Sequence, residues 1–242
     1  MPNGFLYINK PVGPTSHDII DRVRRISGIR TVGHAGTLDP FASGLLIVGV
    51  GREATREFPK LVGLDKRYLA TLRLGATSDT DDRTGVLANS IWHMANGPTK
   101  EEIDAVLKKF TGKILQIPPM YSAKKIKGKK LYELAREGKT FERAPVAIEI
   151  YSISIENYSL LPTHYSLVID IHCSSGTYIR ALARDIGEAL GCGAYLEELE
   201  RTAVGPFTLD EAVKMEDLTP DNWIEHLHPI NSVIARTTAK AG

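Results

Sequence analysis

The sequence predicts an α+β fold, a mixed or antiparallel sheet with flanking helices that we expect against one face. Several predicted strands alternate polar with apolar residues, as antiparallel strands do when one face meets water. Strands and helices alternate irregularly along the chain, which argues against a buried parallel sheet. The length of 242 residues is close to the upper limit for one hydrophobic core, so we expect one domain or one domain with an appendage.

The first fifty residues predict a strand, a helix, a glycine-rich loop and a second strand. The first strand covers Phe5–Asn9, and Ser16 is placed to cap a helix that ends near Gly28. A polar, glycine-rich stretch from Gly33 to Pro40 follows. It leads into an apolar strand over Leu45–Val50. The loop is therefore expected to lie next to a rigid strand.

The rest of the chain continues the irregular alternation. Residues 67–74 alternate as a half-buried strand, with Tyr68 on the apolar side. Thr99 and Glu102 have the spacing of a capping box, which predicts a helix ending at Gly112. The remaining predicted elements are a strand over 146–155, a strand over 164–173, and a helix from about 177 to 191.

Composition narrows the class of protein. The net charge is +1, and 24% of the residues are charged. No apolar run approaches the roughly 20 residues that span a bilayer, and residues 1–11 do not resemble a secretory signal. Two cysteines, Cys173 and Cys192, fit a reducing cytoplasm better than a disulfide framework. His226 and His228 form an isolated pair without further ligand spacing, so we expect no metal.

One segment is strongly basic. Between Ser122 and Arg143, eight lysine and arginine residues stand against three glutamates. Such an excess suits a surface that follows phosphates, and it also suits a solvated helix face. The basic residues are Lys124, Lys125, Lys127, Lys129, Lys130, Arg136, Lys139 and Arg143.

Asp39 stands out among the polar loop residues. Its carboxylate sits between a flexible glycine-threonine run and Pro40, just before an apolar strand. The segment from Gly33 to Pro40 lacks the Gly-Lys-Ser/Thr of a phosphate-binding P-loop and the glycine spacing of a dinucleotide-binding site. Taken alone, an Asp-Pro pair is more often a turn than a catalytic site.

The whole string Gly33-His34-Ala35-Gly36-Thr37-Leu38-Asp39-Pro40 resembles the central motif of the B-type family of tRNA pseudouridine-55 synthases. Further motifs of that family are matched in family order from about residue 5 to residue 210. They are Asn9-Lys10-Pro11 with Gly13 and Thr15-Ser16, Lys66-Arg67-Tyr68 through Thr80, Asp82 and Gly85, Pro118-Pro119 through Gly138, Gly176 to Arg180 with Asp185, and Leu199 with Arg201-Thr202 and Phe207.

The resemblance implies the pseudouridine synthase fold and the isomerisation of uridine 55 in the T-arm (TΨC loop) of tRNA. The target base is flipped out of its stack, its glycosidic bond is broken, and the base is rejoined through carbon. No redox change occurs and no group is donated, so no cofactor is expected. The family places an essential carboxylate at Asp39. It gives Arg180 as the partner that keeps this carboxylate ionised, and Tyr68 as an aromatic group beside the base.

The resemblance also implies RNA contacts. His34 corresponds to the histidine that enters the RNA loop, and Leu199 to the apolar residue on the other side of the base. Tyr178 belongs to the arginine motif and is expected near the RNA. Lys10 and the basic insertion, at about residues 120–145, would hold phosphates. Within the insertion, the candidates are Lys124, Lys125, Lys127, Lys129 and Lys130.

The resemblance also implies where the domain boundaries lie. Residues 1–210 are expected to form the catalytic domain, and 211–242 a short C-terminal extension. Bacterial members of the family usually continue into a small RNA-binding domain of PUA type, and 32 residues are too few for one. We therefore expect a short form that acts as a monomer on the tRNA T-arm in the cytoplasm.

Three other functions remain open. The chain could be a pseudouridine synthase for another RNA, or a non-catalytic chaperone that folds tRNA. A pure binder has no chemical need for Asp39, Tyr68 and Arg180 together. A glycosidic-bond hydrolase is a weak alternative, because no second acidic residue shares a motif with Asp39 as a general acid.

Overall fold

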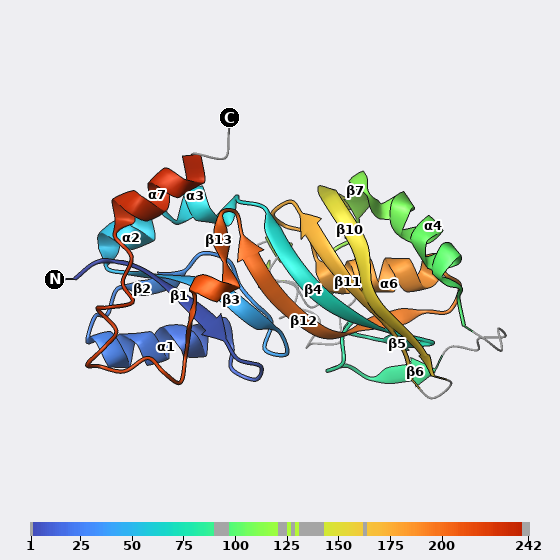
Figure 1. Ribbon diagram of the computed structural model, residues 1–242, viewed down its shortest axis with the longest axis horizontal. Helices are drawn as coiled ribbons and strands as arrows, with labels where there is room; N and C mark the ends of the chain where they lie inside the picture. Colours follow the sequence, from blue (N-terminus) through green and yellow to red (C-terminus); the bar gives the residue numbers. More distant parts are fainter. Residues whose placement is uncertain are drawn as a thin grey trace. The chain divides into compact units, whose positions relative to one another are not determined.

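The computed structural model describes residues 2–89, 97–120, 125–126, 129–130, 143–161 and 164–238. Two compact units are present (Figure 1). The first comprises residues 1–69 and 199–242, and the second residues 70–198. The chain passes from one unit to the other within strands β4 (Lys66–Leu74) and β12 (Ala194–Val204).

The first unit contains a mixed sheet. Its strands follow the order β14-β1-β3-β12, with β1 and β3 antiparallel and β3 and β12 parallel. Strand β2 pairs with β3, and β13 with β12. The elements are β1 (Gly4–Lys10), α1 (Ser16–Ser27), β2 (Val32–His34), β3 (Ser43–Val50), α2 (Arg52–Arg56), α3 (Phe58–Val62), β13 (Phe207–Thr208), η1 (Leu209–Glu211), β14 (Val213–Lys214) and α7 (Ile230–Thr238).

Both faces of this sheet are buried. Leu6 and Ile8 of β1 pack with the apolar side of α1, whereas the alternate residues Phe5 and Tyr7 pack with α2, α3 and α7. Figure 1 shows α1 on one side of the sheet and the other three helices on the opposite side. The expectation of helices on one face was wrong for this unit, because Phe5–Ile8 is apolar on both of its faces.

The N-cap of helix α1 lies one residue earlier than predicted. Thr15 is the N-cap, and it forms a reciprocal capping box with Asp18. Ser16, the predicted cap, is buried as the first helical residue. Its hydroxyl is therefore free for a contact with the loop that holds Asp39, described below.

In the second unit, β10 pairs antiparallel with both β11 and β7. Strands β4, β11, β10 and β7 follow one another in the sheet, and α4 packs against β10 and α6. Its elements are β5 (Ala76–Ser78), β6 (Leu87–Asn89), α4 (Lys100–Phe110), β7 (Gly112–Gln116), β8 (Lys125–Ile126), β9 (Lys129–Lys130), β10 (Val146–Leu161), β11 (His164–Cys173) and α6 (Ile179–Ala189). The predicted α+β class, with a mixed sheet and flanking helices, is confirmed.

Residues after 210 contribute to the core of the first unit. Met215, Leu218 and Trp223 are buried in the cluster under α1, and Val233 of α7 lies in the cluster on the opposite face. The domain boundary at residue 210 remains a prediction. Within the described parts of the chain, no helix is long and apolar enough to cross a membrane.

Candidate active site

Asp39 lies in the loop between β2 and β3, which we call the Asp39 loop (residues 35–42). Ala35, Leu38 and Ala42 are buried and fix this loop against the first unit, while Asp39 is half-buried. The Ala35 amide donates to the carbonyl of Ile47 in β3 at 2.9 Å. The sequence therefore folds a carboxylate onto a loop anchored at intervals by apolar side chains.

Arg201 of β12 binds the first half of this loop. Its side chain is 1% exposed, so the guanidinium must find partners inside the protein. It donates to the carbonyls of Gly36 and Thr37, both at 3.2 Å, and to that of Leu45 at 2.8 Å. Sequence reasoning placed Arg201 in a family motif and gave it no role.

Lys10 of β1 binds the second half of the loop. Its side chain is fully buried, and the ammonium donates to the carbonyls of Ala42 at 2.7 Å, Pro11 at 2.9 Å and Pro40 at 3.4 Å. Burial lowers the pKa of Lys10 to about 8, against the opposing effect of the nearby Asp39 charge. The ammonium is thus directed at backbone carbonyls of the loop, and the phosphate contact expected for Lys10 remains a prediction.

Ser16 completes the support of the loop. Its hydroxyl donates to the Leu38 carbonyl and accepts from the Leu38 amide, both at 2.9 Å. Leu38 directly precedes Asp39, so both polar groups of its backbone are satisfied by one side chain. Together, Arg201, Lys10 and Ser16 hold the Asp39 loop in one conformation before any substrate arrives, which is a feature of catalytic sites.

Three further predicted residues lie in the first unit. Tyr68 of β4 and Leu199 of β12 are nearly buried, with 9% and 8% of their surface exposed. His34 ends β2 and is half-buried, and its Nδ1 has no hydrogen-bond partner among the described residues. Burial lowers the pKa of His34, and the positive charge of Arg201 adds to this effect. The ring of His34 is thereby kept neutral near pH 7.

Arg180 lies in the first turn of α6 in the second unit. It is 6% exposed, and its Nη1 donates to the Asp82 carboxylate at 3.3 Å and to the Thr80 carbonyl at 3.2 Å. Asp39 belongs to the other unit, so the predicted pairing of Arg180 with Asp39 remains a prediction. Sequence reasoning quoted Asp82 in a motif and did not name it as a site residue.

Asp82 is itself firmly held. One carboxylate oxygen accepts from the Thr80 hydroxyl at 2.9 Å, and from the amide and hydroxyl of Thr84 at 2.9 and 2.5 Å. The neighbouring Asp81 has a positive φ of 62° and pairs with Arg184 of α6 at 2.9 Å. Burial raises the pKa of Asp81, and the charge of Arg184 opposes that shift. Two adjacent carboxylates thus bind two arginines of one helix.

The predicted RNA-binding lysines fall largely outside the described residues. Lys124 and Lys127 are not described, and only the backbone of Lys125, Lys129 and Lys130 is described, in β8 and β9. Tyr178 is described, and it is half-buried at the start of α6. Within the described residues, no group of three histidine, cysteine or carboxylate side chains could hold a metal ion.

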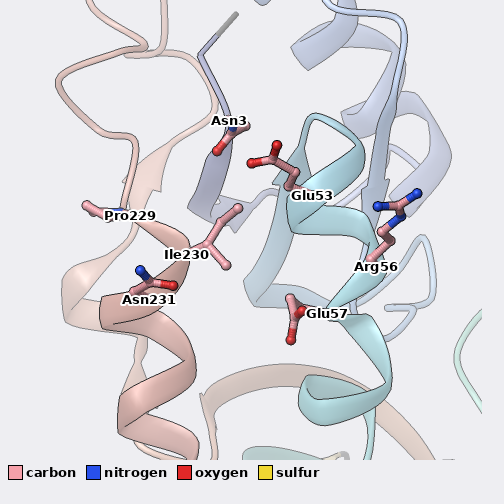
Figure 2. A pocket seen from close by; sticks show the side chains of 7 residues that line it. All are labelled: Asn3, Glu53, Arg56, Glu57, Pro229, Ile230 and Asn231. Atoms are coloured by element: carbon pink, nitrogen blue, oxygen red, sulfur yellow. The ribbon is translucent and has the colours of Figure 1, made fainter.

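A pocket of about 410 Å³ opens elsewhere in the first unit (Figure 2). It lies between α2 and the start of α7, and none of the predicted site residues lines it. The lining residues are Asn3, Glu53, Arg56, Glu57, Pro229, Ile230 and Asn231.

Solved structures share this fold. A crystal structure of a Cbf5-Nop10-Gar1 complex matches with a TM-score of 0.74 at 26% identity, over 97% of this chain and 62% of that chain. The archaeal box H/ACA sRNP Nop10-Cbf5 complex matches with a TM-score of 0.70 at 27% identity, over 96% and 61%. This chain therefore spans less than two thirds of those chains.

Two family models cover most of the sequence. The N-terminal domain of TruB family pseudouridylate synthases matches residues 24–179, and the C-terminal domain of tRNA pseudouridylate synthase B matches residues 180–234. The fold and these matches define a pseudouridine synthase. The chain belongs to the TruB family of these enzymes, which confirms the resemblance found in its motifs.

Relatives named tRNA pseudouridine synthase B are closely similar. The protein of Thermosipho melanesiensis is 46% identical over 231 residues, 96% of this chain and 73% of that relative. The protein of Geotalea uraniireducens is 45% identical over 216 residues, 89% and 67%. The protein of Mycobacterium tuberculosis (strain H37Rv) is 44% identical over 220 residues, 89% and 71%.

Proposed function

We propose that this protein converts uridine 55 in the T-arm of tRNA to pseudouridine, with Asp39 as the essential carboxylate. The observation that carries the proposal is the Asp39 loop, whose carbonyls are bound by two buried cations in a chain of the TruB family. The working form is a monomer in the cytoplasm, and the partner is the T-arm stem-loop.

The reaction needs little more than a fixed carboxylate. The C–N bond between ribose and uracil breaks, the base turns, and a C–C bond forms; the base carbon that joins the ribose loses a proton, and the nitrogen that left it gains one. An ionised Asp39 can attack the base or sugar as a nucleophile, or remove a proton from the ribose. Either role requires that its oxygen be held at a set position, which the clamped loop supplies.

Other side chains are assigned by the family resemblance. Arg180 is the proposed partner of the ionised Asp39, Tyr68 stacks on the base, and Leu199 closes the opposite side. His34 is proposed to fill the space that the flipped base leaves. Its neutral form suits insertion among stacked bases, because no charge has to be desolvated.

The basic insertion is proposed to bind phosphates of the T-arm. Such contacts fix the position of the RNA and do not read its sequence. Because they release counterions, binding should weaken steeply as salt concentration rises.

The substrate assignment is tested by mapping. Unmodified tRNA transcript is incubated with the protein, and pseudouridine is located by site-specific chemical sequencing. A second transcript carries cytidine at position 55 as the control. We expect pseudouridine at position 55 of the first transcript alone. Pseudouridine at another position would show that a different uridine is the target. Binding without any modification would favour a tRNA-folding chaperone.

A further inference from the structure

Gln116, the last residue of β7, holds the backbone of Tyr178. Its side chain is only 1% exposed. The amide nitrogen donates to the Tyr178 carbonyl at 3.0 Å, and the amide oxygen accepts from the Tyr178 N–H at 2.9 Å. Both polar ends of one buried amide are therefore used on a single residue 62 positions away in the sequence.

This contact fixes the start of α6. Tyr178 is the N-cap of the helix and makes no side-chain cap of its own, so the first turn depends on other groups. Its carbonyl also accepts from the Leu182 amide at 3.1 Å, the first bond of the helix. Arg180 follows two residues later and reaches Asp82 from this first turn. The position of Tyr178 consequently determines where the Arg180 side chain begins.

The two residues after Gln116 make further contacts, one with α6 and one with the basic insertion. The Ile117 carbonyl accepts from Arg184 of α6 at 3.3 Å. The Pro118 carbonyl, just before the insertion, accepts at 2.8 Å from Arg143, which lies near the end of the insertion. Gln116 and the two residues after it thus contact the start of α6, its second turn, and Arg143 of the insertion.

We propose that Gln116 is a positioning residue that sets Arg180 through the start of α6. Gln116 ends β7, the strand that leads into the insertion. The same strand therefore holds the start of α6, the helix that carries Arg180. The inference rests on the proposed function. It requires that loss of the Gln116 amide slow the chemical step while the affinity for tRNA stays the same.

The test is a single-turnover assay with saturating wild-type or variant protein and tRNA transcript, alongside equilibrium tRNA binding. Gln116→Met keeps the volume of the side chain and removes both hydrogen bonds. We expect the rate constant to fall by about 10- to 100-fold, because small displacements of catalytic groups have effects of this size. The dissociation constant of tRNA should not change. Leu115→Ala is the control, since this neighbouring side chain on β7 is 72% exposed.

A double-mutant cycle with Arg180→Lys identifies the route. If Gln116 acts through Arg180, adding Gln116→Met to Arg180→Lys should slow the reaction by less than about threefold. Independent effects that multiply would overturn the inference. A Gln116→Met rate equal to wild type, or a defect confined to tRNA affinity, would also overturn it.

Folding is controlled in two ways. Thermal unfolding is recorded for every variant, and Gln116→Glu provides a second substitution that keeps the acceptor for the Tyr178 amide and loses the donor. Gln116→Glu should lie between wild type and Gln116→Met in rate, and a rate equal to wild type would contradict the inference. A wild-type protein that leaves every uridine unchanged would refute the proposed function, and this inference would fail with it.

Discussion

The Lys10 ammonium donates a 2.7 Å hydrogen bond to the carbonyl of Ala42, 32 residues further along the chain. Ala42 closes the loop that presents Asp39, so a buried cation of β1 determines the conformation of a half-buried carboxylate. Arg201 makes the same kind of contact from the other side of the loop. In both cases a positively charged side chain donates hydrogen bonds to backbone carbonyls close to Asp39, the proposed catalytic residue.

Replacing Lys10 should destabilise the fold. Lys10→Met replaces the side chain by an unbranched apolar one that is one atom shorter, and leaves three carbonyls without this donor. Buried acceptors that lose their partner cost about 1–3 kcal/mol in the free energy of unfolding. Urea unfolding at pH 7 measures the change, with the exposed Lys214→Met as the control. Equal stability of Lys10→Met and wild type would show that the ammonium does not hold the loop.

The ionisation of Lys10 should also be visible in the pH dependence of stability. Its pKa is about 8 in the folded protein, against 10.5 ordinarily, so the unfolded chain holds this proton more tightly. The free energy of unfolding should therefore rise between about pH 8 and 10.5 through this group. Lys10→Met lacks the group, and the difference between wild type and Lys10→Met should grow over that interval. A constant difference would contradict the lowered pKa.

Asp82 should matter for both stability and rate. Asp82→Asn keeps the shape of the side chain and removes the negative charge beside Arg180. Hydrogen bonds to charged groups contribute about 1.5–3 kcal/mol, so a loss of this size is expected in the free energy of unfolding. The single-turnover rate should fall as well, because Arg180 loses its fixed partner. Asp79→Asn, an exposed residue in the same turn, is the comparison, and equal effects of the two would refute a specific role.

Gly44 should tolerate no side chain, because Arg201 approaches it closely. A Cβ at Gly44 would lie 2.4 Å from the Arg201 carbonyl oxygen, and the residue has a φ of +106°. Gly13 is the matched control, with a φ of +113° and no atom within 4 Å of its Cβ position. Both alanine variants suffer backbone strain of about 1–3 kcal/mol. Gly44→Ala should lose at least about 2 kcal/mol more through overlap, as measured by urea unfolding. Equal losses would contradict the close approach of β12.

Regular elements with a clear period were predictable. The alternation around Tyr68 gave β4, and the Thr99–Glu102 spacing gave the start of α4, because both signals depend on neighbours in the sequence. The Thr15–Asp18 capping box has the same spacing and would have corrected the start of α1. Helices α2 and α3, with five residues each, are too short to show a period.

The support of the site was not predictable in the same way. A lysine in a loop motif is normally solvated, and the partners of Lys10 at Pro40 and Ala42 lie about thirty residues away. Arg201 binds carbonyls more than 150 residues earlier in the chain. Such contacts follow from strand pairing, which a single sequence does not specify. The family motif located Asp39, and the structure supplies the groups that hold it.

Asp39→Asn tests the central claim most directly, because it removes the charge and keeps the shape of the residue. Wild type, Asp39→Asn and the exposed Asp221→Asn control are compared for tRNA affinity and for pseudouridine at position 55 under single-turnover conditions. We predict that all three bind tRNA equally, that Asp221→Asn modifies it at the wild-type rate, and that Asp39→Asn forms no pseudouridine. Pseudouridine formed by a folded Asp39→Asn at a rate near wild type would contradict the account.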